Sequence, residues 1–243
     1  MKHYKSAESV TKGHPDKLCD YIADSLLDAY LEGDPHSRVA IEVMATKGLL
    51  LIAGEVTSKA KVNVKSVART VLQEVGYLPS HFRIQVRLHK QSPDIAQGVD
   101  RAENLLGAGD QGIVYGYAID ETPELLPLAH VLARKLMARL EEVREEKIIP
   151  ELKPDGKCLV TVEYEDGEAE RIHSVVLSTQ HDECVETSDL RKRVYEHVVR
   201  YVLEGVLPFD EEDVLINPTG RFVLGGPEAD TGLTGRKLTV DTY

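Results

Sequence analysis

The feature that most restricts the fold of this chain is an order of structural elements that occurs twice along it. Apolar residues at helical spacing follow Pro15 and predict a helix with a proline in its first turn. Two apolar runs around the turn Thr46-Lys47-Gly48 predict a hairpin. A second helix that ends at Gly76 and one further strand complete the unit. The predicted ranges are 15–31 and 64–75 for the helices and 39–43, 49–56 and 84–88 for the strands.

The same order of helix, strand, strand, helix and strand returns in the second half of the chain. Its predicted helices are 125–143 and 190–202, and its extended segments are 159–164, 172–177, 214–216 and 222–224. A short extended run precedes each copy, at 3–6 and at 113–119, and a third run begins at Lys237. Because internal copies bury one another's faces, the pattern predicts an α+β fold of repeated α-β-β-α-β units with a third unit only begun. The alternative is a chance alternation of common elements.

Charge and composition exclude several classes of protein. The formal net charge of −12 argues against a protein that binds nucleic acid without sequence preference, because such a protein needs a surplus of Lys and Arg. The chain has no stretch of 18 apolar residues and no apolar segment behind Met1, so neither a membrane span nor a signal peptide is expected. The widely spaced Cys19, Cys158 and Cys184 favour reduced thiols. We therefore expect a cytoplasmic protein.

Two segments carry residues suited to an anionic ligand. His14 and Asp16 lie where a loop enters the first predicted helix, at the positive end of the helix dipole. The alternative is that they only cap that helix. Segments 217–227 and 229–237 together place three cations and one carboxylate among glycines and prolines, where backbone donors can approach a charged ligand closely. The glycine-rich turn 107–112 is neither GxGxxG nor a Walker sequence.

Six short motifs occur in the order in which S-adenosylmethionine synthetases carry them, and together they span essentially the whole chain. They are GHPDK, KQSPDI, GAGDQG, VVLSTQH, NPTGRF and GLTGRK. The resemblance to this family implies three similar α/β units about a pseudo-threefold axis. It implies an N-terminal domain at 1–100, a central domain at 101–228 and the start of a third domain at 229–243, so we expect most of the third unit to be missing.

The resemblance also implies the reaction, in which the methionine sulfur attacks C5′ of ATP and the triphosphate that leaves is hydrolysed to phosphate and diphosphate. Phosphate contacts and catalysis are expected from His14, Lys157, Arg236 and Lys237. Further nucleotide contacts are expected from Asp155, Ser178, Arg221, Phe222 and Asp230. Methionine contacts are expected from Glu55, Gln91, Asp110 and Asp230, with Asp16 as the Mg²⁺ ligand and Glu42 as the K⁺ ligand.

Several alternatives remain open for these residues and for the chain. Glu55 could be an exposed strand residue, Ser178 a strand-end hydroxyl and Phe222 part of the core. Segment 91–101 corresponds to the family's active-site loop, which excludes water when it closes. The resemblance further implies a homodimer or homotetramer with active sites between subunits. The competing functions are a non-catalytic binding or dimerising module and, more remotely, a kinase.

Overall fold

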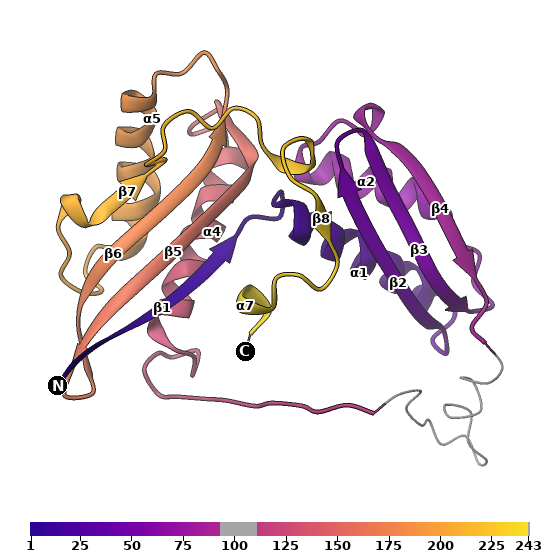
Figure 1. Ribbon diagram of the computed structural model, residues 1–243, viewed down its shortest axis with the longest axis horizontal. Helices are drawn as coiled ribbons and strands as arrows, with labels where there is room; N and C mark the ends of the chain where they lie inside the picture. Colours follow the sequence, from indigo (N-terminus) through magenta and orange to yellow (C-terminus); the bar gives the residue numbers. More distant parts are fainter. Residues whose placement is uncertain (93–110, 243) are drawn as a thin grey trace.

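The structure is a computed structural model and describes residues 1–92 and 111–242. It contains two four-stranded sheets that lie side by side, each with helices packed on one face (Figure 1). The first sheet has the strand order β4-β3-β2-β8, and the second has the order β1-β5-β6-β7. The strands are β1 (Lys2–Val10), β2 (Arg38–Thr46), β3 (Leu49–Thr57), β4 (Arg83–His89), β5 (Leu152–Glu165), β6 (Glu168–His181), β7 (Val214–Ile216) and β8 (Gly232–Leu233).

The predicted repeat is present in the structure, and the α+β class is confirmed. The first unit runs α1 (Pro15–Gly33), β2, β3, α2 (Val64–Val75), β4, and the second runs α4 (Leu128–Glu145), β5, β6, α5 (Thr187–Val194), β7. In each unit the two hairpin strands are antiparallel and the third strand joins in parallel. The two sheets therefore share one topology.

Each sheet is completed by a strand from elsewhere in the chain. β1, which precedes the first unit, pairs antiparallel with β5 of the second unit. β8, which follows the second unit, pairs antiparallel with β2 of the first. These added strands occupy equivalent edges, because each lies beside the first strand of a hairpin. The exchange ties the two units together and brings residues near position 10 close to residues near 157.

This exchange explains where the sequence-based expectations were wrong. Residues 113–119 form no strand, and the edge beside β5 is already paired with β1. The run that begins at Lys237 forms a helical turn, α7 (Leu238–Asp241), since β8 holds the edge beside β2. Segment 222–224 is no strand either. Phe222 accepts one backbone hydrogen bond from His181, but its own N–H donates to the His181 ring instead of to a neighbouring strand.

The helices of the first unit begin where the sequence predicts, and α2 also ends there, whereas α1 runs two residues further, to Gly33. Pro15 stands at the first position of α1, and His14 precedes it. The side chain of Asn63 accepts a hydrogen bond from Ser66 at the start of α2. Gly76 ends α2 in the left-handed conformation with φ of 106°.

In the second unit the last predicted helix is less regular. α5 continues through a π-helical segment, Tyr195–Arg200, into α6 (Tyr201–Leu203).

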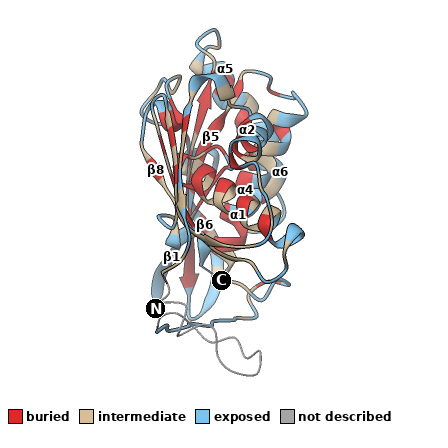
Figure 2. Ribbon diagram, turned by 90° about the vertical axis from the view of Figure 1, so that its right-hand side faces the viewer, coloured by how far each residue is buried: buried red, intermediate tan, exposed pale blue. Residues whose placement is uncertain are grey.

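Two hydrophobic cores lie between the sheets and their helices. Figure 2 colours the buried residues of the strands and helices red. Leu18, Ile22 and Leu26 line the buried face of α1 and are fully buried against the first sheet. Leu136 and Leu140 of α4 pack on the second sheet in the same way. The three cysteines are free thiols. Across residues 1–92 and 111–242, no helix combines the length and the apolar character needed to cross a membrane.

Candidate functional site

The candidate site is built around the first turn of α1. The Nδ1 atom of His14 accepts a hydrogen bond from the backbone N–H of Asp16 at 3.2 Å. Asp16 is buried and His14 is partly buried. The unpaired N–H groups of a helix's first turn carry partial positive charge and bind anions. This end of α1 therefore favours a negatively charged ligand.

His14 is uncharged at neutral pH. Burial, followed by the positive charges of Lys237 and Lys157, lowers the pKa of His14 to about 4, against the opposing influence of Asp16 and Asp230. Since Nδ1 accepts the Asp16 N–H, the proton of the neutral ring is assigned to Nε2. His14 thus offers one N–H donor at this site rather than a positive charge.

Two lysines from distant parts of the chain supply positive charge next to His14. The Nζ atom of Lys237 lies 3.3 Å from Oδ2 of Asp16. The Nζ atom of Lys157, on β5, lies 2.5 Å from Oε2 of Glu8 on the neighbouring strand β1. Burial raises the pKa of Glu8, but hydrogen bonds from Lys157 and Thr239 outweigh it and lower the pKa overall. The structure therefore brings together three residues predicted for the phosphates and the predicted metal ligand.

Asp155 is a buried carboxyl group beside this cluster. Its side chain is only slightly exposed, and Oδ2 accepts a hydrogen bond from the backbone N–H of Gly226 at 2.8 Å. Burial raises the pKa of Asp155 to about 6, and the negative charge of Asp230 adds to the effect. Buried carboxyl groups with shifted pKa values and charged neighbours are concentrated at functional sites. Asp155 and Asp230 thus belong to the same cluster as Lys237.

Strand β8, which precedes Lys237 in the chain, packs against the first turn of α1. Oδ1 of Asp16 accepts a hydrogen bond from the backbone N–H of Leu233 at 3.0 Å. A Cβ atom at Gly232 would lie 2.1 Å from the carbonyl oxygen of Pro15, so only glycine fits this approach. Glu42 of β2 accepts a hydrogen bond from Thr234 in the same segment. Sequence reasoning did not identify Gly232, although the glycine-rich composition of its segment was the available signal.

We predict that Gly232→Ala separates β8 from α1. The added methyl group must displace backbone atoms, so the free energy of unfolding should fall by roughly 1–3 kcal/mol. Urea denaturation measures this change. Gly116→Ala is the matched control because a Cβ atom there meets open space. Equal stability of the Gly232→Ala and Gly116→Ala proteins would contradict the close approach.

The remaining residues predicted for the nucleotide lie around this cluster or on the nearby surface. Ser178 of β6 is the register partner of Lys157. The backbone N–H of Phe222 donates to Nε2 of His181 at 3.1 Å. Arg221 is exposed and lies 3.1 Å from Glu183, whereas Arg236 is exposed next to Lys237.

Two residues predicted for methionine lie away from the cluster. Leu233 of β8 pairs with Met44 of β2, whose register partner on β3 is Leu51. Glu55 lies four residues farther along β3 than Leu51, a separation of about 13 Å at the usual strand rise. Gln91 lies beyond the end of β4 and accepts a hydrogen bond from Arg38 at 3.1 Å. Asp110, and the predicted active-site loop after Ser92, fall outside the described residues.

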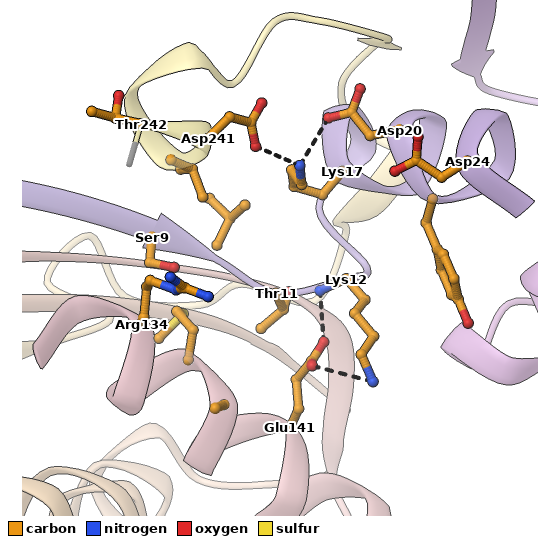
Figure 3. A pocket seen from close by; sticks show the side chains of 15 residues that line it. Ser9, Thr11, Lys12, Lys17, Asp20, Asp24, Arg134, Glu141, Asp241 and Thr242 are labelled. Carbon is orange, nitrogen blue, oxygen red and sulfur yellow. Dashed lines mark hydrogen bonds and ion pairs between the residues drawn. The ribbon is translucent and has the colours of Figure 1, made fainter. Parts of the chain in front are cut away.

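A cavity of about 630 Å³ between α1, α4 and α7 is lined by none of the predicted site residues (Figure 3). In it, Lys17 contacts Asp20 and Asp241, and Lys12 contacts Glu141. Arg134 and Asp24 line the cavity as well. Because none of the predicted site residues lines this cavity, the candidate site remains the group of residues at the start of α1.

The acidic residues fit a metal that is shared with a ligand. Among residues 1–92 and 111–242, no three His, Cys, Asp or Glu side chains form a metal site by themselves. Mg²⁺ is commonly held by one or two carboxylates together with substrate phosphates. Asp16, next to the lysines, meets that description, and Glu42 offers a carboxylate oxygen at the edge of the same segment.

Two residues of this neighbourhood carry no signal in the predicted motifs. Glu8 pairs with Lys157 across β1 and β5, and Tyr77 donates a hydrogen bond to the carbonyl of Gly13. Glu8 follows the extended run predicted at 3–6, in a stretch without regular apolar spacing. Tyr77 follows the helix-ending Gly76. Their positions depend on contacts between distant segments, so local sequence patterns do not reveal them.

Comparison with known proteins yields two family matches and many similar sequences. The model of the S-adenosylmethionine synthetase N-terminal domain matches residues 2–97, and that of the central domain matches residues 105–222. An S-adenosylmethionine synthase of Pseudothermotoga lettingae is 47% identical over 263 residues, and one of Clostridium tetani is 45% identical over 260 residues. Both alignments cover 100% of this chain and 66% of the relative. The chain thus spans about two thirds of the length of these relatives.

Proposed function

The chain belongs to the S-adenosylmethionine synthetase family, and from this premise we propose that it forms S-adenosylmethionine from ATP and L-methionine. The product triphosphate is then hydrolysed to phosphate and diphosphate. The observation that carries the proposal is the convergence of His14, Lys157 and Lys237 at the first turn of α1, beside Asp16. In this proposal the site binds the polyphosphate of ATP.

The charges of the cluster suit a reaction in which the leaving group gains negative charge. The methionine sulfur attacks C5′, the C5′–O bond breaks, and the triphosphate departs with the bonding electrons. Donors that are already oriented toward this developing charge stabilise the transition state without reorganisation. Lys157 and Lys237 supply fixed positive charge, and His14 supplies an uncharged N–H donor. Arg236 is proposed to contact the phosphates as well. Asp155, Ser178, Arg221 and Phe222 are proposed to lie around the nucleotide, and Asp230 to contact both the nucleotide and methionine.

We assign Mg²⁺ to Asp16 and K⁺ to Glu42 as part of the same proposal. Mg²⁺ bound with the phosphates would neutralise part of their charge. Asp16 would hold the ion through its carboxylate oxygens, of which Oδ1 also accepts the Leu233 N–H and Oδ2 lies 3.3 Å from the Nζ atom of Lys237. Glu42 is exposed and offers a carboxylate oxygen, a ligand type that hard cations prefer.

We further propose that the complete active site lies between two subunits of a homodimer, or of a homotetramer built from such dimers. Glu55 and Gln91, which the family resemblance assigns to methionine, lie about 13 Å or more along the first sheet from the contacts of β8. A second subunit could bring its own copies of these residues to the phosphate cluster. This separation within one chain supports a shared site.

The test of the reaction uses two proteins, because the chain spans 66% of the length of its relatives. One is the 243-residue chain. The other, here called the continued protein, is this chain followed by the remaining third of the Pseudothermotoga lettingae relative. We expect the continued protein to convert ATP and methionine to S-adenosylmethionine, phosphate and diphosphate, as measured by chromatography and phosphate release.

The products also separate this function from the competing ones. ADP with a phosphorylated acceptor would contradict the proposal and indicate a kinase. Binding of ATP with Mg²⁺ by both proteins, without any S-adenosylmethionine from either, would favour a non-catalytic binding module.

A further inference from the structure

The hydroxyl group of Tyr77 lies between two segments of the candidate site, the loop before His14 and the turn at Gly226. It donates a hydrogen bond of 2.6 Å to the carbonyl oxygen of Gly13, directly before His14. It also lies against the turn at Gly226, whose N–H holds Asp155. Tyr77 itself belongs to neither segment, since it follows the end of α2.

The loop that carries His14 has little freedom on its other sides. Gly13 is buried, and a Cβ atom there would lie 2.3 Å from the carbonyl oxygen of Pro154. The hydroxyl of Thr11 donates to that same carbonyl at 2.7 Å. The Tyr77 hydrogen bond adds a third restraint, because it binds the carbonyl oxygen of Gly13 itself. A buried carbonyl without its donor is costly.

The contact with Gly226 is equally close. A Cβ atom at Gly226 would lie 2.1 Å from the Tyr77 oxygen, and Gly226 has φ of 63°, a conformation that favours glycine. Burial raises the pKa of Tyr77, and the negative charge of Asp155 raises it further. The phenol therefore stays protonated and remains a donor. One hydroxyl group thus supports both the His14 loop and the turn that holds Asp155.

We propose that Tyr77 is a positioning residue of the polyphosphate site, which holds the Gly13–His14 backbone and thereby aims the His14 N–H and the first turn of α1. This inference rests on the proposed function. It goes beyond that function because Tyr77 is assigned to no ligand and acts through its hydrogen bond to Gly13. The aromatic ring has a separate structural role, since it packs edge-on against Phe82 with ring centres 6.3 Å apart.

The experiment removes the hydroxyl and keeps the ring. In Tyr77→Phe, amide hydrogen exchange of a peptide covering residues 11–18 should become at least about fivefold faster in the ligand-free 243-residue chain. The affinity for tripolyphosphate with Mg²⁺, measured by titration calorimetry well below the unfolding temperature, should fall about tenfold. A purely structural tyrosine would lower the unfolding temperature but leave this affinity unchanged.

Tyr21→Phe is the matched control. It removes a hydroxyl that donates to Glu74 at 3.0 Å and so links α1 to α2, but that hydroxyl's partner is Glu74 and not the Gly13 carbonyl. The control should match the wild type in both measurements. Unchanged exchange of residues 11–18 in Tyr77→Phe, or an equal effect of Tyr21→Phe, would overturn the inference. If the wild-type protein did not bind tripolyphosphate, this result would contradict the proposed function, on which the role of Tyr77 rests.

Discussion

Replacing Lys237 by alanine in the continued protein should lower turnover by about 10²- to 10³-fold, which is the usual cost of losing one preorganised transition-state contact. Lys237 lies 3.3 Å from Asp16 and lowers the pKa of His14, so its charge reaches the centre of the cluster. Lys157→Ala should have an effect of the same order. Because the charge on the leaving group grows only in the transition state, the Michaelis constant for methionine should change by less than about threefold.

Steady-state kinetics with varied methionine at saturating ATP measures this division between turnover and binding. Lys47→Ala is the control, since its side chain is 75% exposed and its Nζ atom is 4.0 Å from Glu228, outside the cluster. Unchanged turnover combined with weaker binding of both substrates would contradict the assignment of Lys157 and Lys237 to the leaving group. Partial recovery in Lys237→Arg would support a role for charge rather than for packing.

Asp155→Asn should stabilise the ligand-free chain at pH 8 and at the same time weaken nucleotide binding. The folded protein raises the pKa of Asp155 from 3.8 to about 6, chiefly through burial. Below pH 3.8 the carboxyl group is protonated in both states, so it costs nothing. Between pH 3.8 and about 6 the unfolded chain loses this proton while the folded state keeps it, so stability falls progressively as the pH rises. Above about pH 6 the folded state carries the buried negative charge and the loss is complete.

The difference between these pKa values corresponds to about 3 kcal/mol, and for a chain of this size it should raise the unfolding temperature at pH 8 by roughly 5–10 °C. At about pH 5, which lies between the two pKa values, the gain should be about half as large. Asparagine keeps an oxygen that can accept the Gly226 N–H. Thermal unfolding at both pH values measures the effect, and calorimetry with ATP and Mg²⁺ measures the loss of binding.

Asp182→Asn is the control for this prediction, because the Asp182 side chain is 50% exposed and pairs with Lys153 on the surface. It should change the unfolding temperature little at either pH. A lower stability of Asp155→Asn at both pH values would show that the carboxylate is favourable in the fold. The expected combination, more stable but weaker in binding, is typical of a charge retained for function.

The sequence by itself determined the local elements and the family. Apolar periodicity identified α1, α2 and the hairpin β2–β3, and Gly76 marked the end of α2, because these features depend on residues near one another in the chain. The motif order indicated the family that the comparisons establish. The domain boundaries at 100 and 228 stay predictions, as do the roles assigned to the individual site residues.

Only the tertiary structure decided which strands complete the sheets and which side chains meet. β1 precedes the first unit but pairs with the second, and β8 follows the second unit but pairs with the first. A sheet edge accepts any strand with free N–H and C=O groups, so the alternation of apolar residues along a strand does not identify its partner. That exchange sets Lys157 beside Glu8 and Lys237 beside Asp16, more than a hundred residues apart in sequence. The pKa values of His14 and Asp155 follow from the same burial and the same distant charges, which no local pattern encodes.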